Sequence, residues 1–256
     1  MKLTRILVVA ITSTAAFALT PAESKIEAAK RVLAKSGANA ESVTDLAWAY
    51  IKRARETSDV QYYVLAQAAI TNALKLRPDD FEARKAECAI LVAKGEYTNG
   101  LELARSLNKR IPDDVLVYGF IADAEMALGH IDAAEKAAQW MLDLRPANVP
   151  GMLRGAELRR IFKDPDGAID WLNQAYRRVQ PEETEERAYI LTRISEVYIS
   201  KGDVKNAARA AEQSLKVFPA YPKGLEQVER VKAATQASAG AVISSDPSTG
   251  KSPSTE

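Results

Sequence analysis

A spacing of 34 residues constrains the fold of this sequence more than any other feature. The stretch KGEYTNGLELA begins at Lys94, and LGHIDAAEKAA begins 34 residues later at Leu128. A third stretch with the same placing of small residues, KGDVKNAARAA, begins at Lys201. A repeat at this interval is typical of proteins built from stacked two-helix units. The sequence therefore predicts an elongated array of similar hairpins.

Glycines and prolines divide each unit into two helices. Gly95, Gly129 and Gly202 each end an apolar helical stretch, where a left-handed C-terminal residue favours glycine. Proline cannot continue a helix, and the Asp or Asn that follows it can cap the next one. Alternating strand patterns are absent between residues 23 and 234, where good helix formers dominate. The dividing prolines are Pro78, Pro112, Pro146, Pro181 and Pro219.

Small residues recur on the second helix of each unit. Gly100 and Ala104 lie four positions apart, so they share one helix face and let a neighbouring helix approach closely. A single hairpin cannot bury its own apolar face, so neighbouring units must stack to close the core. The equivalent pairs are Ala134 with Ala138 and Ala207 with Ala211.

The pattern resembles the tetratricopeptide repeat (TPR) family. The match lies in the small residues of the second helices, in the closing prolines and in Tyr97 just after Gly95. Cys88, Ala122, Ala156 and Ser195 stand where that family has a first-helix glycine. The resemblance implies an all-α, right-handed solenoid of about five units with capping helices. The units are expected at 41–78, 79–112, 113–146, 147–181 and 182–219, with caps at 23–40 and 220–234 and a disordered tail at 235–256.

Two units depart from the repeat in length. In the first, the segment ARETSDVQYY replaces the glycine turn and predicts a longer connection. In the fifth, the lead-in PEETEER adds about four residues and is interpreted as a solvated turn. In the fourth unit Lys163 takes the glycine position, followed by Asp164 and Pro165 as cap and first-turn proline.

The N-terminal residues 1–22 have the pattern of a secretory signal peptide. Lys2 and Arg5 precede 14 uncharged residues, Ile6–Leu19, and this stretch is shorter than the roughly 20 residues that a spanning helix needs. Ala18 and Ala22 each end a candidate cleavage motif. We expect a periplasmic or secreted protein with no membrane span after cleavage, although an uncleaved anchor is the alternative.

The residue inventory argues against catalysis and cofactors. The chain has 35 basic and 34 acidic residues, so no strong net field attracts nucleic acid. It has one His and one Cys, and none of the common nucleotide, zinc or hydrolase motifs. We therefore expect a protein that is not an enzyme and holds no metal. Paired carboxylates remain the one chemistry that this inventory leaves open.

Several single residues have a structural and a functional interpretation. His130, beside a turn glycine, is interpreted as an exposed turn residue, and Cys88 as a small buried hydrophobe rather than a reactive thiol. Trp48, Trp140 and Trp171 could form a ligand cage, but core packing is the favoured interpretation.

Superposition of the units at 34 residues predicts a groove along the first helices. One column of positions reads Ala89, Asp123, Glu157 and Glu196, which would place three acids in a line. The hypothesis is an apolar groove that binds an extended or helical peptide carrying basic residues, while solvated acids are the equal alternative. The full candidate set is Lys85, Leu116, Asp123, Met126, Leu153, Glu157, Arg160, Tyr189, Glu196 and Ile199.

The function predicted from these features is an exported, non-enzymatic scaffold for a protein or peptide partner. An assembly or accessory factor of an envelope complex, or a regulatory subunit of a separately encoded enzyme, is the alternative. The basic clamp by which some TPR proteins hold a C-terminal carboxylate is disfavoured, because Lys85 is followed by Ala89 and then by acids.

Overall fold

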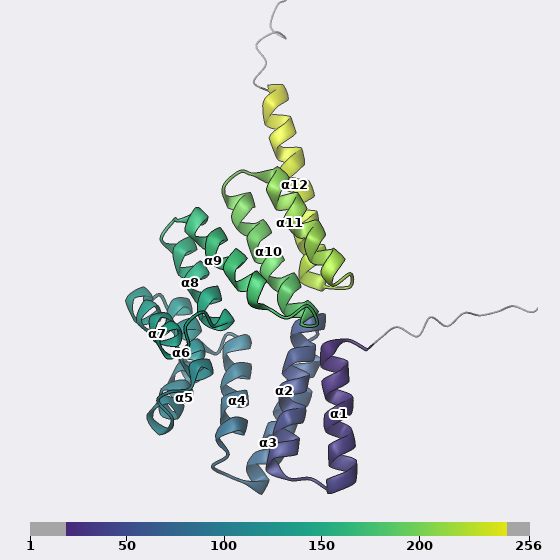
Figure 1. The fold of residues 1–256 in the computed structure, drawn as a ribbon, viewed down its shortest axis with the longest axis vertical. Helices are drawn as coiled ribbons and strands as arrows, with labels where there is room; N and C mark the ends of the chain where they lie inside the picture. The colour runs from purple at the N-terminus through teal and green to yellow at the C-terminus, as the bar shows by residue number, and fades with distance from the viewer. Residues whose placement is uncertain (1–18, 245–256) are drawn as a thin grey trace, which may run out of the picture.

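The computed structural model describes residues 19–244, and residues 1–18 and 245–256 lie outside the described part. The described part is all-α, with twelve helices and no strand (Figure 1). They are α1 (Pro21–Ser36), α2 (Ala40–Thr57), α3 (Gln61–Leu76), α4 (Phe81–Ala93), α5 (Tyr97–Arg110), α6 (Val115–Ala127), α7 (Ile131–Leu144), α8 (Val149–Ile161), α9 (Pro165–Arg178), α10 (Thr184–Ser200), α11 (Val204–Val217) and α12 (Pro222–Ser244).

The helices form stacked hairpins, as the repeat predicted. Each pair from α2–α3 to α10–α11 packs as a hairpin, and each second helix also contacts the first helix of the next unit. α1 packs on α2 at one end, and α12 packs on α10 and α11 at the other. These two extra helices make twelve in the described part, which corresponds to about six two-helix units.

The glycine turns have the predicted left-handed backbone. Gly95, Gly129 and Gly202 have φ angles of 79°, 82° and 76°. Lys163 takes the same conformation in the fourth unit, with a φ of 58°, although a side chain is disfavoured there. Asp164 then caps α9 by accepting a hydrogen bond from the Gly167 N–H at 2.9 Å. The four turns therefore share one geometry despite the missing glycine.

The proline turns are closed by side-chain caps. Asp80, Asp114 and Asn148 follow the prolines, and each accepts a hydrogen bond from a backbone N–H in the first turn of the next helix. The distances are 2.8, 3.0 and 2.7 Å. These caps fix where α4, α6 and α8 begin, and so they set the period of the first helices.

The small residues of the repeat are buried at helix contacts. Cys88 Sγ donates to the Gly100 carbonyl at 3.3 Å, and Ser195 Oγ donates to the Ala207 carbonyl at 2.8 Å. The two pairs occupy equivalent positions in the second and fifth units, so each polar side chain joins the two helices of one hairpin. Ala66, Ala122, Ala134, Ala156 and Ala168 are also buried.

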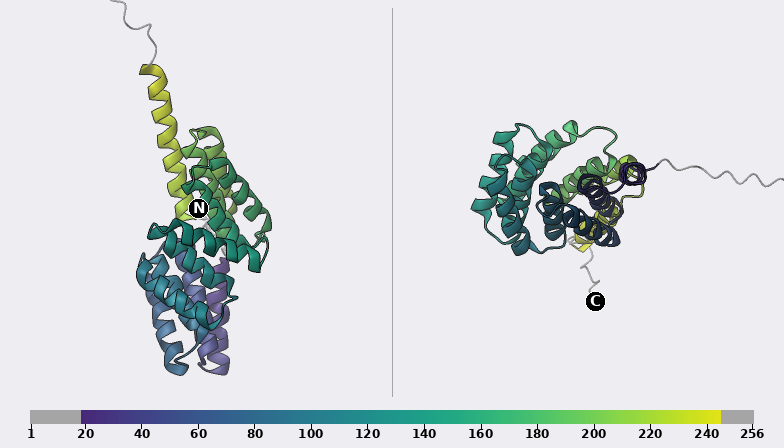
Figure 2. Two further views of the ribbon diagram at one scale, coloured as in Figure 1. Left: turned by 90° about the vertical axis from the view of Figure 1, so that its left-hand side faces the viewer. Right: turned by 90° about the horizontal axis from the view of Figure 1, so that it is seen from below.

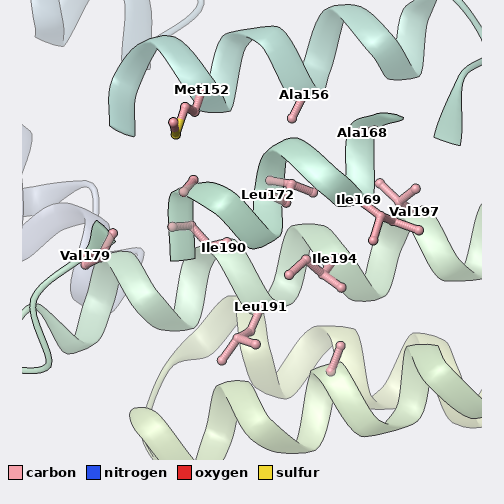
Figure 3. Close-up of a cluster of buried hydrophobic side chains, with 12 residues drawn as sticks. Met152, Ala156, Ala168, Ile169, Leu172, Val179, Ile190, Leu191, Ile194 and Val197 are labelled. Atoms are coloured by element: carbon pink, nitrogen blue, oxygen red, sulfur yellow. The ribbon is translucent and has the colours of Figure 1, made fainter. Parts of the chain in front are cut away.

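The largest apolar cluster lies in the second half of the array. Figure 3 shows buried side chains of this cluster on the successive helices α8, α9 and α10, and Ala210 of α11 also belongs to it. Met152 on α8 and Leu172 on α9 face Ile190 and Ile194 on α10, and all four are buried. This continuous core holds the inner helices α8 and α10 in fixed positions.

The prediction of a longer connection in the first unit was wrong, whereas the fifth unit does contain about four extra residues. Only residues 58–60 separate α2 from α3, as residues 94–96 separate α4 from α5. The extra residues lengthen helices instead, since α2 has 18 and α10 has 17 residues where α4 has 13. Ser58 takes the left-handed position, with a φ of 56°, in place of glycine.

Both ends of the array differ from the predicted bounds. α1 begins at Pro21, inside the range 1–22 assigned to a signal peptide, because Thr20 caps it. Residues 1–18 of that range lie outside the described residues. α12 runs to Ser244, so the prediction of a tail from 235 was wrong for 235–244, an alanine-rich segment that favours helix. Val32 on α1 and Leu225 on α12 are both 49% exposed, so each end helix presents an apolar side chain to solvent.

Candidate functional site

The inner face of the array forms a groove between the first helices of the units. Its lining comes mainly from α2, α4, α6, α8 and α10, as the repeat predicted, and its volume is about 570 Å³. Figure 2 shows how the hairpins turn about this face, so that the first and last units approach each other. The groove is therefore bounded by helices from every unit of the array.

Seven of the ten candidate residues line this groove. They are Leu116, Asp123, Met126, Leu153, Glu157, Arg160 and Tyr189.

Three candidates do not line the groove. Lys85 binds Glu82 and Asp114, each at 2.8 Å, and so ties α4 to the cap of α6. Glu196 lies farther along α10, paired with arginines, and Ile199 packs against the cluster between α11 and α12.

The acidic column exists, but its carboxylates are paired with arginines. Arg154 binds Asp123 at 2.5 Å, and Arg160 binds Glu157 at 2.5 Å. Arg193 bridges Glu157 to the last acid of the column. The three acids of the predicted column are therefore each paired with an arginine. Charge is balanced within the groove wall, and the basis for selecting basic side chains is lost.

Arg193 is the central residue of these ion pairs, since it contacts both Glu157 and Glu196. Burial alone would raise the pKa of Glu157, but the hydrogen bond from Arg160 and the charge of Arg193 outweigh it and hold that pKa below its ordinary value. Burial alone would lower the pKa of Arg193, but Tyr189 and the two glutamates raise it. Glu157 is therefore ionised at neutral pH, and its ion pair with Arg193 joins α8 to α10.

The floor of the groove is apolar. Leu116 on α6 is 37% exposed and lines both this groove and a neighbouring cavity. Met126, Leu153 and Tyr189 continue the apolar surface along α6, α8 and α10. Trp48 on α2 completes it at the far end. A preformed apolar surface flanked by neutral ion pairs suits a ligand with apolar side chains.

An ion-pair seam joins α1 and the first unit to the fifth unit and closes the groove on one side. We use this name for three contacts: Lys52 with Glu183, Lys25 with Glu183, and Arg55 with Glu185. The last two distances are 3.9 and 2.9 Å. The seam lies over a second cavity of about 590 Å³ that shares its lining with the groove. The partners in Lys52–Glu183 are 131 residues apart in sequence.

The helix ends on either side of the seam favour these charges. Arg55 lies in the last turn of α2, where the helix dipole attracts cations. Glu183 is the N-cap of α10 and Glu185 lies in its first turn, where anions are favoured. Glu185 is 3% exposed, and burial raises its pKa although Arg55 opposes the shift. The interpretation of PEETEER as a solvated turn was therefore wrong for these two glutamates.

The single cysteine and histidine lie outside the groove lining. Burial raises the pKa of the Cys88 thiol to about 12, which confirms its interpretation as an unreactive packing residue. The His130 ring is 62% exposed, and its Nδ1 lies 2.8 Å from Glu125 Oε2. Within residues 19–244 no group of three His, Cys, Asp or Glu side chains is placed to hold a metal ion.

The tryptophans divide between core and surface. Trp171 packs partly buried against the main cluster, as predicted. Trp140 is 52% exposed and stacks on Tyr118 at 6.1 Å between ring centroids, so its assignment to the core was wrong. Trp140 on α7 and Tyr118 on α6 therefore form a stacked aromatic pair whose tryptophan is exposed to solvent.

Sequence reasoning missed Arg154, Arg193 and the two seam glutamates. Arg154 and Arg193 lie 31 and 36 residues after their acidic partners, so neither appears at the 34-residue spacing used to find the columns. The acidic run before α10 was a visible signal for the seam. Its partners on α2 could not be chosen without knowing how far the array turns.

Comparison with known proteins gives matches in structure only. No family model and no curated protein matches the sequence. The TPR protein TTC0263 of Thermus thermophilus matches at 21% identity over 74% of this chain and 99% of its own, with a TM-score of 0.60.

Two longer chains contain a similar array. The Cut9–Hcn1 hetero-tetramer of APC/C matches at 17% identity with a TM-score of 0.63, and yeast Tom70 at 15% with 0.56. The matches cover 85% and 87% of this chain but only 39% and 44% of those chains. In the described part, none of the helices is both long and apolar enough to cross a membrane. The chain has the tetratricopeptide repeat fold.

Proposed function

We propose that this chain is an exported, non-enzymatic scaffold that holds an apolar segment of a protein partner in its groove. The observation that carries the proposal is the apolar floor from Trp48 to Tyr189, flanked by arginines whose charges are already balanced. A preformed surface of this kind loses little conformational freedom on binding. The fold supports the same role, since stacked repeats expose long concave surfaces.

The pairing within the groove wall defines the class of segment. Asp123 and Glu157 each have an arginine partner, so an added lysine or arginine would have to displace it. Apolar side chains gain from leaving water without breaking any pair, at about 25 cal/mol for each Å² that is buried. The affinity for such a segment should change little with salt, because no net charge is neutralised.

Substitutions of two leucines test the groove: Leu116 lies in α6, and Leu128 is the C-cap residue of the same helix. Leu116 and Leu128 are both 37% exposed, but only Leu116 lines the groove. Leu116→Glu should abolish the capture of a partner from an envelope fraction, because it places an unpaired carboxylate on the apolar floor. Leu128→Glu is the matched control and should capture the same partner as the wild type.

The readout is quantitative mass spectrometry of the captured proteins. The proposal expects at least one protein that the wild type and Leu128→Glu enrich and that Leu116→Glu loses. Circular dichroism of both variants confirms that the fold is retained. Identical sets from all three chains would rule out the groove as the binding surface.

A further inference from the structure

A buried glutamate on α2 holds the start of the folded chain. Glu56 is 1% exposed, and its Oε2 accepts a hydrogen bond from the Thr20 hydroxyl at 2.5 Å. Its Oε1 accepts one from the Ala22 backbone N–H at 2.9 Å, and Arg53 donates to the same carboxylate at 3.0 Å. A buried carboxylate needs such donors, because an unpaired one is costly.

The same residues form the cap of α1. The Thr20 hydroxyl accepts a hydrogen bond from the Glu23 N–H at 3.2 Å, and the Glu23 carboxylate accepts one from the Thr20 N–H at 2.9 Å. Ala22 has no exposed surface, whereas Leu19 is 57% exposed. Thr20 and Ala22 are therefore held by contacts with α2, whereas Leu19 is largely in solvent.

The two candidate processing sites have opposite effects on this network. Hydrolysis after Ala22 would remove both Thr20 and Ala22, which donate two of the three hydrogen bonds to Glu56 described above. Of those three donors, Glu56 would keep Arg53. This hydrolysis would also place a new ammonium group at the N-terminus of α1, where the helix dipole disfavours a cation. Hydrolysis after Ala18 would leave every one of these contacts in place and put the new ammonium group on exposed Leu19.

We infer that the chain is processed between Ala18 and Leu19, and that Glu56 is the internal anchor of the new N-terminus. The class of enzyme is a signal peptidase, which adds water across the peptide bond and leaves a carboxylate on Ala18 and an amine on Leu19. Ala16 and Ala18 supply the A-x-A pattern, whereas the second candidate has Thr20 in place of the first alanine. This inference rests on the exported part of the proposed function and is independent of the groove.

Intact mass and N-terminal sequencing of the exported protein test the site. The full chain is expressed in a bacterial host with its own N-terminal residues, and the periplasm and medium are analysed. A chain that begins at Leu19 supports the inference, and one that begins at Glu23 overturns it while export stands. An unprocessed chain retained in the cell overturns both. Ala18→Leu should block processing, whereas the control Ala22→Leu should be processed as the wild type is.

A stability comparison tests the anchor itself. A chain that starts at Glu23 should melt several degrees below one that starts at Leu19, because it lacks two of the donors to Glu56. Glu56→Gln should lower the melting temperature of the Leu19 chain more than that of the Glu23 chain. Equal melting temperatures for the two starting points would overturn the role of Glu56.

Discussion

Gly95 shows what one turn residue contributes to a repeat. Its φ of 79° is favourable for glycine and costly for a β-branched side chain. Gly95→Val should destabilise the protein by about 1 kcal/mol or more. A circular-dichroism melt measures the change. Gly155→Ala is the control of opposite sign, since its new methyl group would meet Trp171 at an ordinary 3.6 Å and alanine favours helix. A Gly95→Val melt that matches the wild type would contradict the turn.

Lys163 offers the reverse substitution at the equivalent turn. Its φ of 58° carries a cost that glycine does not have, so Lys163→Gly should stabilise the fold. The gain should be up to about 1 kcal/mol, because the greater freedom of the unfolded glycine chain offsets part of it. Urea unfolding with an unchanged slope measures the shift in the midpoint. A lower midpoint would show that the lysine side chain stabilises the turn in another way.

Ser195 shows how one side chain connects three helices at the scale of elements. Its hydroxyl donates to the Ala207 carbonyl on α11 and accepts from buried Gln227 on α12, at 2.8 and 3.0 Å. Ser195→Ala leaves both groups without this partner and should cost about 1–3 kcal/mol. Thermal melting measures the loss. Ser195→Cys, which introduces the residue found at Cys88, should retain more of the stability than alanine does.

The hairpins could be predicted from sequence because their signals are local. Gly129 ends one helix, Asp114 caps another, and each acts within a few residues of its own position. Helix lengths in the first and fifth units could not be predicted, since extra residues can enter a loop or a helix. In the structure the extra residues extend α2 and α10, which pack against their neighbours. The repeat spacing does not show where extra residues will be placed.

At the scale of the whole molecule, the positions of the groove could be predicted but not its charge. Leu116, Leu153 and Tyr189 follow from the helix face that each unit turns inward. The pairing of Asp123 with Arg154 depends on side-chain direction between neighbouring units. The seam depends on the sum of small rotations along the array, and no single unit encodes that sum.

The seam predicts a change in shape on charge reversal. Lys52→Glu would face Glu183, repel it and let the first and fifth units move apart. Small-angle X-ray scattering should show a larger radius of gyration than that of the wild type. The double variant Lys52→Glu with Glu183→Lys should restore the compact form. An unchanged radius in the single variant would show that packing alone sets the shape.

The two seam glutamates predict opposite dependences on pH. The pKa of Glu185 is raised by burial, so the stability that it contributes falls as pH rises from about 4.5 through the folded pKa. The pKa of Glu183 is lowered by its hydrogen bond from Lys52, so its contribution is present above about pH 4.5 and is lost as pH falls. The melting temperature is measured against pH for Glu185→Gln, Glu183→Gln and the wild type. The difference from the wild type should change above about pH 4.5 for Glu185→Gln and below about pH 4.5 for Glu183→Gln. Parallel curves would contradict both shifts.

The seam also changes how the chain is expected to fold. An open row of repeats has contacts between near neighbours alone, so its ends can unravel independently of its middle. A contact between residues 131 apart gives the row a circular topology, whose closure costs entropy that grows slowly with loop length. The seam couples the first unit to the fifth, so that local unfolding of one of these units also breaks ion pairs that stabilise the other. Unfolding should then be more cooperative than in a linear array of the same length, and folding slower than its local contacts alone would give.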